Sequence, residues 1–153
     1  MRASQKFNVR VYGVCINAAG ELLVADERIQ GREITKLPGG GLEFGEGPVD
    51  CVKREFIEET GQAVQVVRHF YTTDFFVLSA FSANSQIVSI YYEVKFEADV
   101  HFEIKTKKFD FPKGTDNVYV FRWVPLSKLS PSEFSFPIDK KVAELLLSEN
   151  TAK

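Results

Sequence analysis

The feature that most constrains this chain is a glycine-rich turn followed by a short helix, in the stretch GGGLEFGEGPVDCVKREFIEETG from Gly39 to Gly61. Pro48 marks the helix start, because a proline at the first helical position gives up an N–H that would have no partner there. Gly61 marks the end, because glycine readily takes the left-handed conformation that terminates helices. The sequence therefore predicts a helix that begins directly after a flexible turn.

The predicted helix has an apolar side and an acidic side. At about 100° of rotation per residue, four residues share one side: Val49, Val52, Phe56 and Thr60. Glu55, Glu58 and Glu59 cluster on another side, where each like-charged pair destabilises the helix by roughly 0.2–0.5 kcal/mol. A divalent cation would remove this repulsion, and oxygen ligands suit Mg²⁺, Ca²⁺ or Mn²⁺ rather than zinc or copper. A solvated acidic face is the alternative interpretation of these glutamates taken alone.

The turn and the helix together carry a longer pattern of residues at fixed spacing. Gly40 is followed by Glu46, then by a group within the helix: Arg54-Glu55, the apolar Phe56, Glu58-Glu59 and Gly61. This arrangement resembles the Nudix box, the signature of the Nudix hydrolases, and every fixed residue of that signature is present. Gln62 departs from the signature, because the family has an aliphatic residue at this position. The departure affects packing at the end of the helix rather than the chemistry of the site.

The resemblance implies an α/β fold of Nudix type, an α/β/α sandwich in which a mixed β-sheet has helices on both faces. It also implies a metal-dependent hydrolase that cleaves the pyrophosphate bond of a nucleoside diphosphate linked to another moiety. Nucleotide sugars, ADP-ribose and nucleoside triphosphates all fit, with Mg²⁺ as cofactor and Mn²⁺ as a substitute. The alternative is a non-catalytic nucleotide-binding or sensor domain of the same fold. Such domains usually have eroded boxes, and this box is intact.

Roles within the box follow from the same resemblance. The metal ligands would be the carbonyl of Gly39 and three carboxylates, those of Glu55, Glu58 and Glu59. Arg54 resembles the residue that holds the turn and orients a carboxylate, with Glu46 as its structural partner or as an acid near the metals. We therefore expect a catalytic set that consists of Arg54, Glu46, Glu55 and Glu58.

Other candidate residues lie outside this set. The general base would be Glu55 if it belongs to the box, or an acid of a later loop, where Glu103, Asp110 and Asp116 are available; for each of these three, a solvated surface position is the plainer interpretation. Arg28 and Arg32 could bind a substrate phosphate bidentately, or could be ordinary surface charges.

The pair Phe109 and Phe111 lies in a polar loop. These rings could stack on a nucleobase, although packing into the core is the more common role of such aromatic residues.

Composition limits the remaining classes. With 153 residues, the chain is expected to form a single domain over residues 1–153. A net charge of −2 and a pI near 5.8 argue against binding to a nucleic acid duplex. Cys15 and Cys51 lie in apolar patterns and are predicted to be free, buried thiols. The first ten residues lack an apolar leader and no apolar run could span a membrane, so we expect a cytoplasmic protein. The resemblance is also compatible with a homodimer.

Hydrophobic patterns predict the elements around the box. The expected strands are Phe7 to Asn17, Glu21 to Ala25 paired back on it as a hairpin, Ala63 to Phe76, Gln86 to Glu97 and Val118 to Val124. The polar segment from Asp26 to Ile34 is predicted to be a loop, and a terminal helix is expected around Ile138 to Leu146.

Overall fold

The computed structural model describes residues 4–151, which form two mixed β-sheets and two α-helices. The helices are α1 (Pro48–Thr60) and α2 (Pro137–Thr151), and two short 3-10 turns, η1 (Leu126–Lys128) and η2 (Pro131–Glu133), precede α2. The strands are β1 (Lys6–Cys15), β2 (Glu21–Ile29), β3 (Arg32–Lys36), β4 (Gly39–Gly41), β5 (Val64–Thr72), β6 (Ser85–Phe96), β7 (Ile104–Lys105) and β8 (Val118–Pro125).

Each sheet contains four strands, with one parallel pair among antiparallel neighbours. The first has the order β4-β1-β6-β5, in which β1 and β6 are parallel from the Lys6–Ser85 pair to the Cys15–Val94 pair. The second has the order β3-β2-β8-β7, in which β7 and β8 are parallel. The predicted mixed α/β architecture is confirmed, although hydrogen bonding divides the strands into two sheets.

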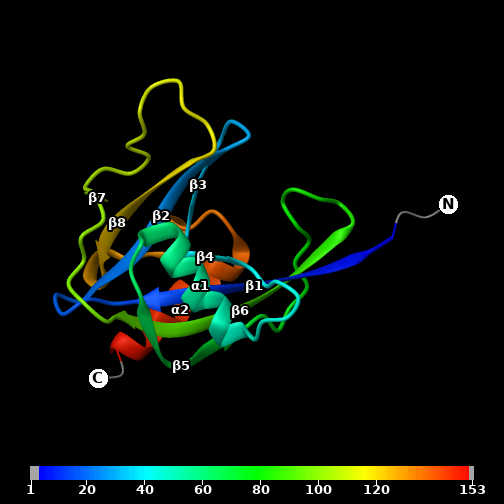
Figure 1. Cartoon of the computed structure of the whole chain (residues 1–153), viewed down its shortest axis with the longest axis horizontal. Helices are drawn as coiled ribbons and strands as arrows, with labels where there is room; N and C mark the ends of the chain where they lie inside the picture. The colour runs from blue at the N-terminus through cyan, green and yellow to red at the C-terminus, as the bar shows by residue number, and fades with distance from the viewer. Residues whose placement is uncertain (1–3, 152–153) are drawn as a thin grey trace.

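The two helices cover opposite faces of the strands, with α1 in front and α2 behind in Figure 1. Successive side chains of a strand point to opposite faces. Accordingly, β1 places Val11 and Cys15 in the core beside α1, and Tyr12 and Val14 in the core beside α2. β2 alternates in the same way, so both strands are apolar on both sides, and the molecule is the expected sandwich.

The segment after β1 differs from the prediction. The polar stretch from Asp26 to Ile34 is not a loop: β2 continues to Ile29 and the chain turns back as β3. Asp26 is fully buried in this hairpin because Arg122 of β8 neutralises it, with Nε 2.6 Å from Oδ2. The partner that allows polar Asp26 to be buried in a strand is thus almost a hundred residues away, and the local sequence pattern could not indicate it.

The predicted hairpin between the first two strands is present only at its turn, where Ile16 and Leu22 form an isolated antiparallel bridge and the Asn17 N–H donates to the Glu21 carbonyl at 2.9 Å. The rest of the predicted pairing is wrong, because β2 forms its antiparallel ladder with β8, starting from the pair of Glu21 with Pro125. β5 ends at Thr72 rather than at Phe76. The segment between β5 and β6 then lies beside the start of β1, at the right of Figure 1.

Two expectations from composition can be compared with the structure. Cys15 and Cys51 are buried free thiols, as predicted. Neither helix within residues 4–151 is long and apolar enough to cross a bilayer.

Candidate active site

The box helix begins and ends where the sequence predicts. Pro48 occupies the first turn, and Gly61 ends the helix with a left-handed φ of 74°. The side chain of Asp50 accepts a hydrogen bond from the Gly47 N–H at 3.1 Å and so caps the helix. The buried side of α1 is formed by Cys51, Val52, Phe56 and Thr60, whereas Val49 is exposed.

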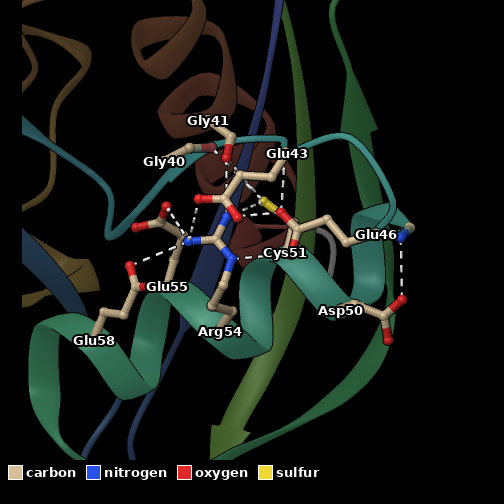
Figure 2. A network of polar contacts seen from close by, with 10 residues as sticks. Gly40, Gly41, Glu43, Glu46, Asp50, Cys51, Arg54, Glu55 and Glu58 are labelled. Atoms are coloured by element: carbon tan, nitrogen blue, oxygen red, sulfur yellow. Dashed lines mark hydrogen bonds and ion pairs between the residues drawn. The ribbon is translucent and has the colours of Figure 1, made fainter.

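Arg54 links the helix to the turn (Figure 2). Its guanidinium forms two bonds to Glu46, at 2.9 Å and 2.7 Å, and donates to the Gly41 carbonyl at 3.0 Å. The same group reaches back along α1 to Glu55 at 3.0 Å and to Glu58 at 3.1 Å. The bond from Arg54 holds the pKa of Glu46 well below its usual range, at about 2. Arg54 therefore fixes the turn and two carboxylates of the helix at once.

The carboxylate of Glu55 packs against the backbone of Gly40. A Cβ atom at position 40 would lie only 2.5 Å from Oε1 of Glu55. Only glycine leaves room for the carboxylate here, since real Cβ atoms do not approach so closely. The close approach of Glu55 to the backbone of β4 therefore depends on the absence of a side chain at position 40.

Glu59 lies about one helical turn after Glu55 on α1, among several charged groups. Burial raises the pKa of Glu59 to about 7, with Glu55 and Glu27 acting in the same direction. Lys36 and a backbone hydrogen bond from Gly39 oppose the rise. Lys36 and Gly39 thus compensate only part of the negative charge of Glu59 and its acidic neighbours.

Lys36 is the positive charge in this cluster. Its ammonium donates to the Gly39 carbonyl at 3.3 Å and pairs with Glu27 at 3.2 Å. Burial lowers the pKa of Lys36, but Tyr12, Glu27 and Glu59 outweigh that effect and raise it above the ordinary value. Lys36 is therefore charged in the folded protein.

The donor atoms at this turn are chemically suited to a magnesium ion. Glu55, Glu59 and the Gly39 carbonyl offer hard oxygen ligands, which Mg²⁺ takes alongside water and phosphate oxygens. Within residues 4–151, no three His, Cys, Asp or Glu side chains form a ready-made cluster for a metal. The residues fit a cation that completes its coordination with water and substrate, rather than one enclosed by protein.

Glu58 is more exposed than these donors: its side chain is 56% exposed, and it shares Nη1 of Arg54 with Glu55. The three later acids have different surroundings. Glu103 lines a small cavity of about 190 Å³ together with Glu59. Asp116 instead accepts a hydrogen bond from the Gly31 N–H in the β2–β3 turn, and Asp110 is exposed.

The two predicted phosphate-binding arginines lie on the β2–β3 hairpin. Arg28 donates to the Thr115 carbonyl at 3.1 Å and pairs with Glu33. Arg32 lies over the ring of Phe81, 4.9 Å from its centroid. Arg32 therefore reaches the edge of the pocket described next, whereas Arg28 is held by the loop before β8.

Phe109 and Phe111 stack on each other, with ring centroids 6.2 Å apart. Neither ring belongs to the residues that line the pocket.

A pocket of about 480 Å³ lies next to the acidic cluster. Its charged end includes Arg10, Glu27 and Lys36. Its apolar wall comes largely from the segment after β5 and the start of α2, and includes Phe75, Phe76, Val77, Leu78, Phe81, Phe136 and Ile138. Tyr91 and Asp139 add a buried polar pair, joined by a 2.7 Å hydrogen bond. The pocket is thus charged near the turn and aromatic farther away.

Sequence reasoning missed Arg10, Glu27 and Lys36 because they lie outside the box. Their common signal is a charged residue within or beside an otherwise apolar strand, since a buried charge needs a partner. Gln62, where the box departs from the family pattern, bonds to the Asp99 carbonyl at 2.8 Å and to the His101 N–H at 2.7 Å. These bonds tie the end of α1 to the chain after β6 in place of apolar packing.

The NUDIX domain family matches residues 6–146. The structure is similar to the solution structure of the E. coli ORF135 protein, with TM-score 0.72 and 16% identity over 97% of this chain and 94% of that one. It is also similar to the MutT protein from Methanosarcina mazei Go1, with TM-score 0.68 and 20% identity over 97% and 99% of the two chains.

An ADP-ribose pyrophosphatase from Streptococcus suis has TM-score 0.58 and 14% identity, over 94% of this chain and 91% of that one. At these identities the likeness shows a shared fold. Curated proteins gave no match.

Proposed function

This chain belongs to the Nudix family of pyrophosphohydrolases, and from that premise we propose that it cleaves the pyrophosphate bond of a nucleoside diphosphate linked to another group, with a divalent cation as cofactor. The observation that carries the proposal is the convergence of Glu55, Glu59 and the Gly39 turn beside a large pocket. A pyrophosphate concentrates negative charge, so cations must neutralise it before a nucleophile can approach.

In this proposal Glu55, Glu59 and the carbonyl of Gly39 would hold Mg²⁺ or Mn²⁺. Once bound, the cation would neutralise phosphate charge and activate a water for attack on phosphorus. Arg54 keeps Glu55 in place through the bond to Oε1. We assign proton removal to Glu103, because it is the one of the three later acids that lines the cavity with Glu59, where its side chain is 72% exposed and paired with Lys105. Glu55 is the rival candidate.

The pocket supports a substrate with a flat aromatic group. Its volume falls within the range of about 300–1,000 Å³ that is usual for small-molecule sites. Phe75, Phe81 and Phe136 provide an apolar wall, and such rings stack readily on a nucleobase. We propose that the base binds there while the phosphates extend toward the turn. Similar structures include a MutT protein and an ADP-ribose pyrophosphatase, which are consistent with a nucleotide substrate.

A substrate panel tests the proposal. Nucleotide sugars, ADP-ribose and nucleoside triphosphates would be incubated with the protein and Mg²⁺, and mononucleotide and phosphate release would be measured. At least one compound should be cleaved, and excess chelator should abolish turnover. Full turnover in excess chelator would refute the metal role, and metal-dependent binding without cleavage of any compound would favour the sensor function. Comparing Glu103→Gln with Asp110→Asn tests the base, because only the first should lower turnover.

A further inference from the structure

The Lys36 side chain is enclosed at the charged end of the pocket. It is only 9% exposed, and its ammonium contacts the Gly39 carbonyl and Glu27 while lying 5.5 Å from the centroid of the Tyr12 ring. A buried ammonium needs such partners, because leaving water is costly for a charge. These contacts therefore hold the ammonium at the Gly39 carbonyl in the resting protein.

The strand register explains how Lys36 arrives there. Lys36 ends β3 opposite Ala25 of β2, and Glu27 lies two residues farther along β2 on the same face. Diagonal neighbours on one face of an antiparallel pair lie within reach of long side chains. Leu37 and Pro38 then lead directly into the Gly39 turn. The hairpin thus delivers one positive charge to the atom that we assign as a cation ligand.

Two cations cannot both contact the Gly39 carbonyl without strong repulsion. Lys36 also lines the pocket, and its stem of four methylene groups allows the ammonium to turn away from the carbonyl. We propose that Lys36 holds the Gly39 carbonyl in the resting protein, yields it to the divalent cation, and then binds a phosphate of the substrate. This inference rests on the proposed function.

A purely structural ion pair with Glu27 is the competing explanation. In that case, removing the charge would lower stability but would leave the affinities for metal and phosphate unchanged. Competition predicts opposite effects on the two ligands, because the same ammonium opposes the metal and favours the phosphate. The two explanations can be separated by binding measurements without any turnover.

The first measurement is Mn²⁺ binding to the substrate-free protein, followed by electron paramagnetic resonance. Lys36→Met should bind Mn²⁺ about tenfold more tightly or better, since a nearby positive charge has been removed. Lys36→Arg keeps the charge and should bind like the wild type. Lys53→Met removes an exposed charge from α1 and is the matched control. Should Lys36→Met fold poorly, Lys36→Gln provides a second neutral variant that can still donate to the carbonyl.

The second measurement is binding of methylenediphosphonate, a diphosphate that cannot be hydrolysed, to the Mn²⁺-loaded proteins. Lys36→Met should bind it roughly 10- to 100-fold more weakly, the effect of losing a charge-assisted hydrogen bond. Unchanged or weaker Mn²⁺ binding by Lys36→Met would overturn the inference, as would unchanged diphosphonate affinity. A wild-type protein that binds no Mn²⁺ would refute the proposed function and this inference with it.

Discussion

Glu58 and Glu59 are neighbours in the sequence, yet their side chains lie in different environments. Glu58 is largely exposed and bound to Arg54, whereas Glu59 is half-buried beside Lys36, Glu55 and Glu27. A carboxylate held in an acidic, partly desolvated position gains most from a bound cation. The structure therefore supports a larger role for Glu59 than for Glu58 in our proposal.

Glu59→Gln should lower turnover by about 10²–10⁴-fold, the range expected for a positioned catalytic group. Its free energy of unfolding should stay constant or rise slightly, because a like-charge contact is relieved. Glu58→Gln should lose less turnover than Glu59→Gln. Glu144→Gln, on the exposed side of α2, should have the turnover and the stability of the wild type. Steady-state rates and urea unfolding of the three variants provide the comparison. Turnover of Glu59→Gln within twofold of the wild type would overturn the assignment of the site.

Asp139 gives a prediction about pH. Burial raises the pKa of Asp139 to about 6, against the opposing hydrogen bond from Tyr91. Between its ordinary value and this one, the folded protein holds a proton that the unfolded chain releases, so stability falls as pH rises through about 4 to 6 and stays low above. Asp139→Asn has no such charge and keeps an acceptor for Tyr91.

The stability of Asp139→Asn relative to the wild type should therefore increase by roughly 1–3 kcal/mol from pH 4 to pH 7. Urea unfolding at several pH values measures the difference. Asp110→Asn, at an exposed position, should show no such trend. Parallel pH curves for wild type and Asp139→Asn would contradict the prediction.

At the scale of elements, α1 and β4 meet where Glu55 touches the backbone of Gly40. The contact is possible because position 40 has no side chain, and Arg54 draws the two elements together through the Gly41 carbonyl. Because α1 and β4 lie close together, the carboxylate of Glu55 is confined to a position against the backbone of Gly40.

Gly40→Ala should displace the carboxylate of Glu55, since the new Cβ would lie 2.5 Å from its Oε1. Turnover should fall by about 10- to 100-fold, because a misplacement of about 1 Å is enough for such a loss. Unfolding stability should change by less than about 1 kcal/mol, since the end of a flexible side chain can move. In Gly41→Ala the Cβ would lie 3.7 Å from Arg10, an ordinary contact, so this variant should retain activity. Equal rates for the two variants would show that the position of Glu55 is unimportant.

At the scale of the whole molecule, Cys15 and Cys51 come from β1 and α1 and share one core cluster between them. Burial raises the pKa of each thiol to about 12. The thiolate is the reactive form, so both side chains should be protected as long as the fold is intact.

Alkylation by iodoacetamide at pH 8 should therefore be at least about 100-fold slower in the folded protein than in guanidinium-unfolded protein. Mass spectrometry should show two added groups only after unfolding. Rapid labelling of the folded protein would mean that this core opens readily, and a mass two units low would indicate a disulfide.

The box was predictable from the sequence because its contacts are local. The start and end of α1, the Arg54–Glu46 partnership and the glutamates all depend on spacing within one turn and one helix. The α/β/α sandwich followed from the resemblance that this spacing carries, and the apolar residues on both faces of β1 agree with it. Such local features can be predicted without knowing which distant segments contact them.

The rest of the site depended on pairing between distant strands. The polar β2–β3 hairpin reads as a loop until Arg122 neutralises Asp26, and its register alone brings Lys36 and Glu27 to the Gly39 turn. Arg28, a predicted phosphate ligand, is instead bound to the Thr115 carbonyl, whereas Arg10 lines the pocket. The acidic face of the box could be predicted from the sequence, because its geometry is that of one helix. The charges around that face could not, because a buried charge is stable only where other segments of the fold supply its partners.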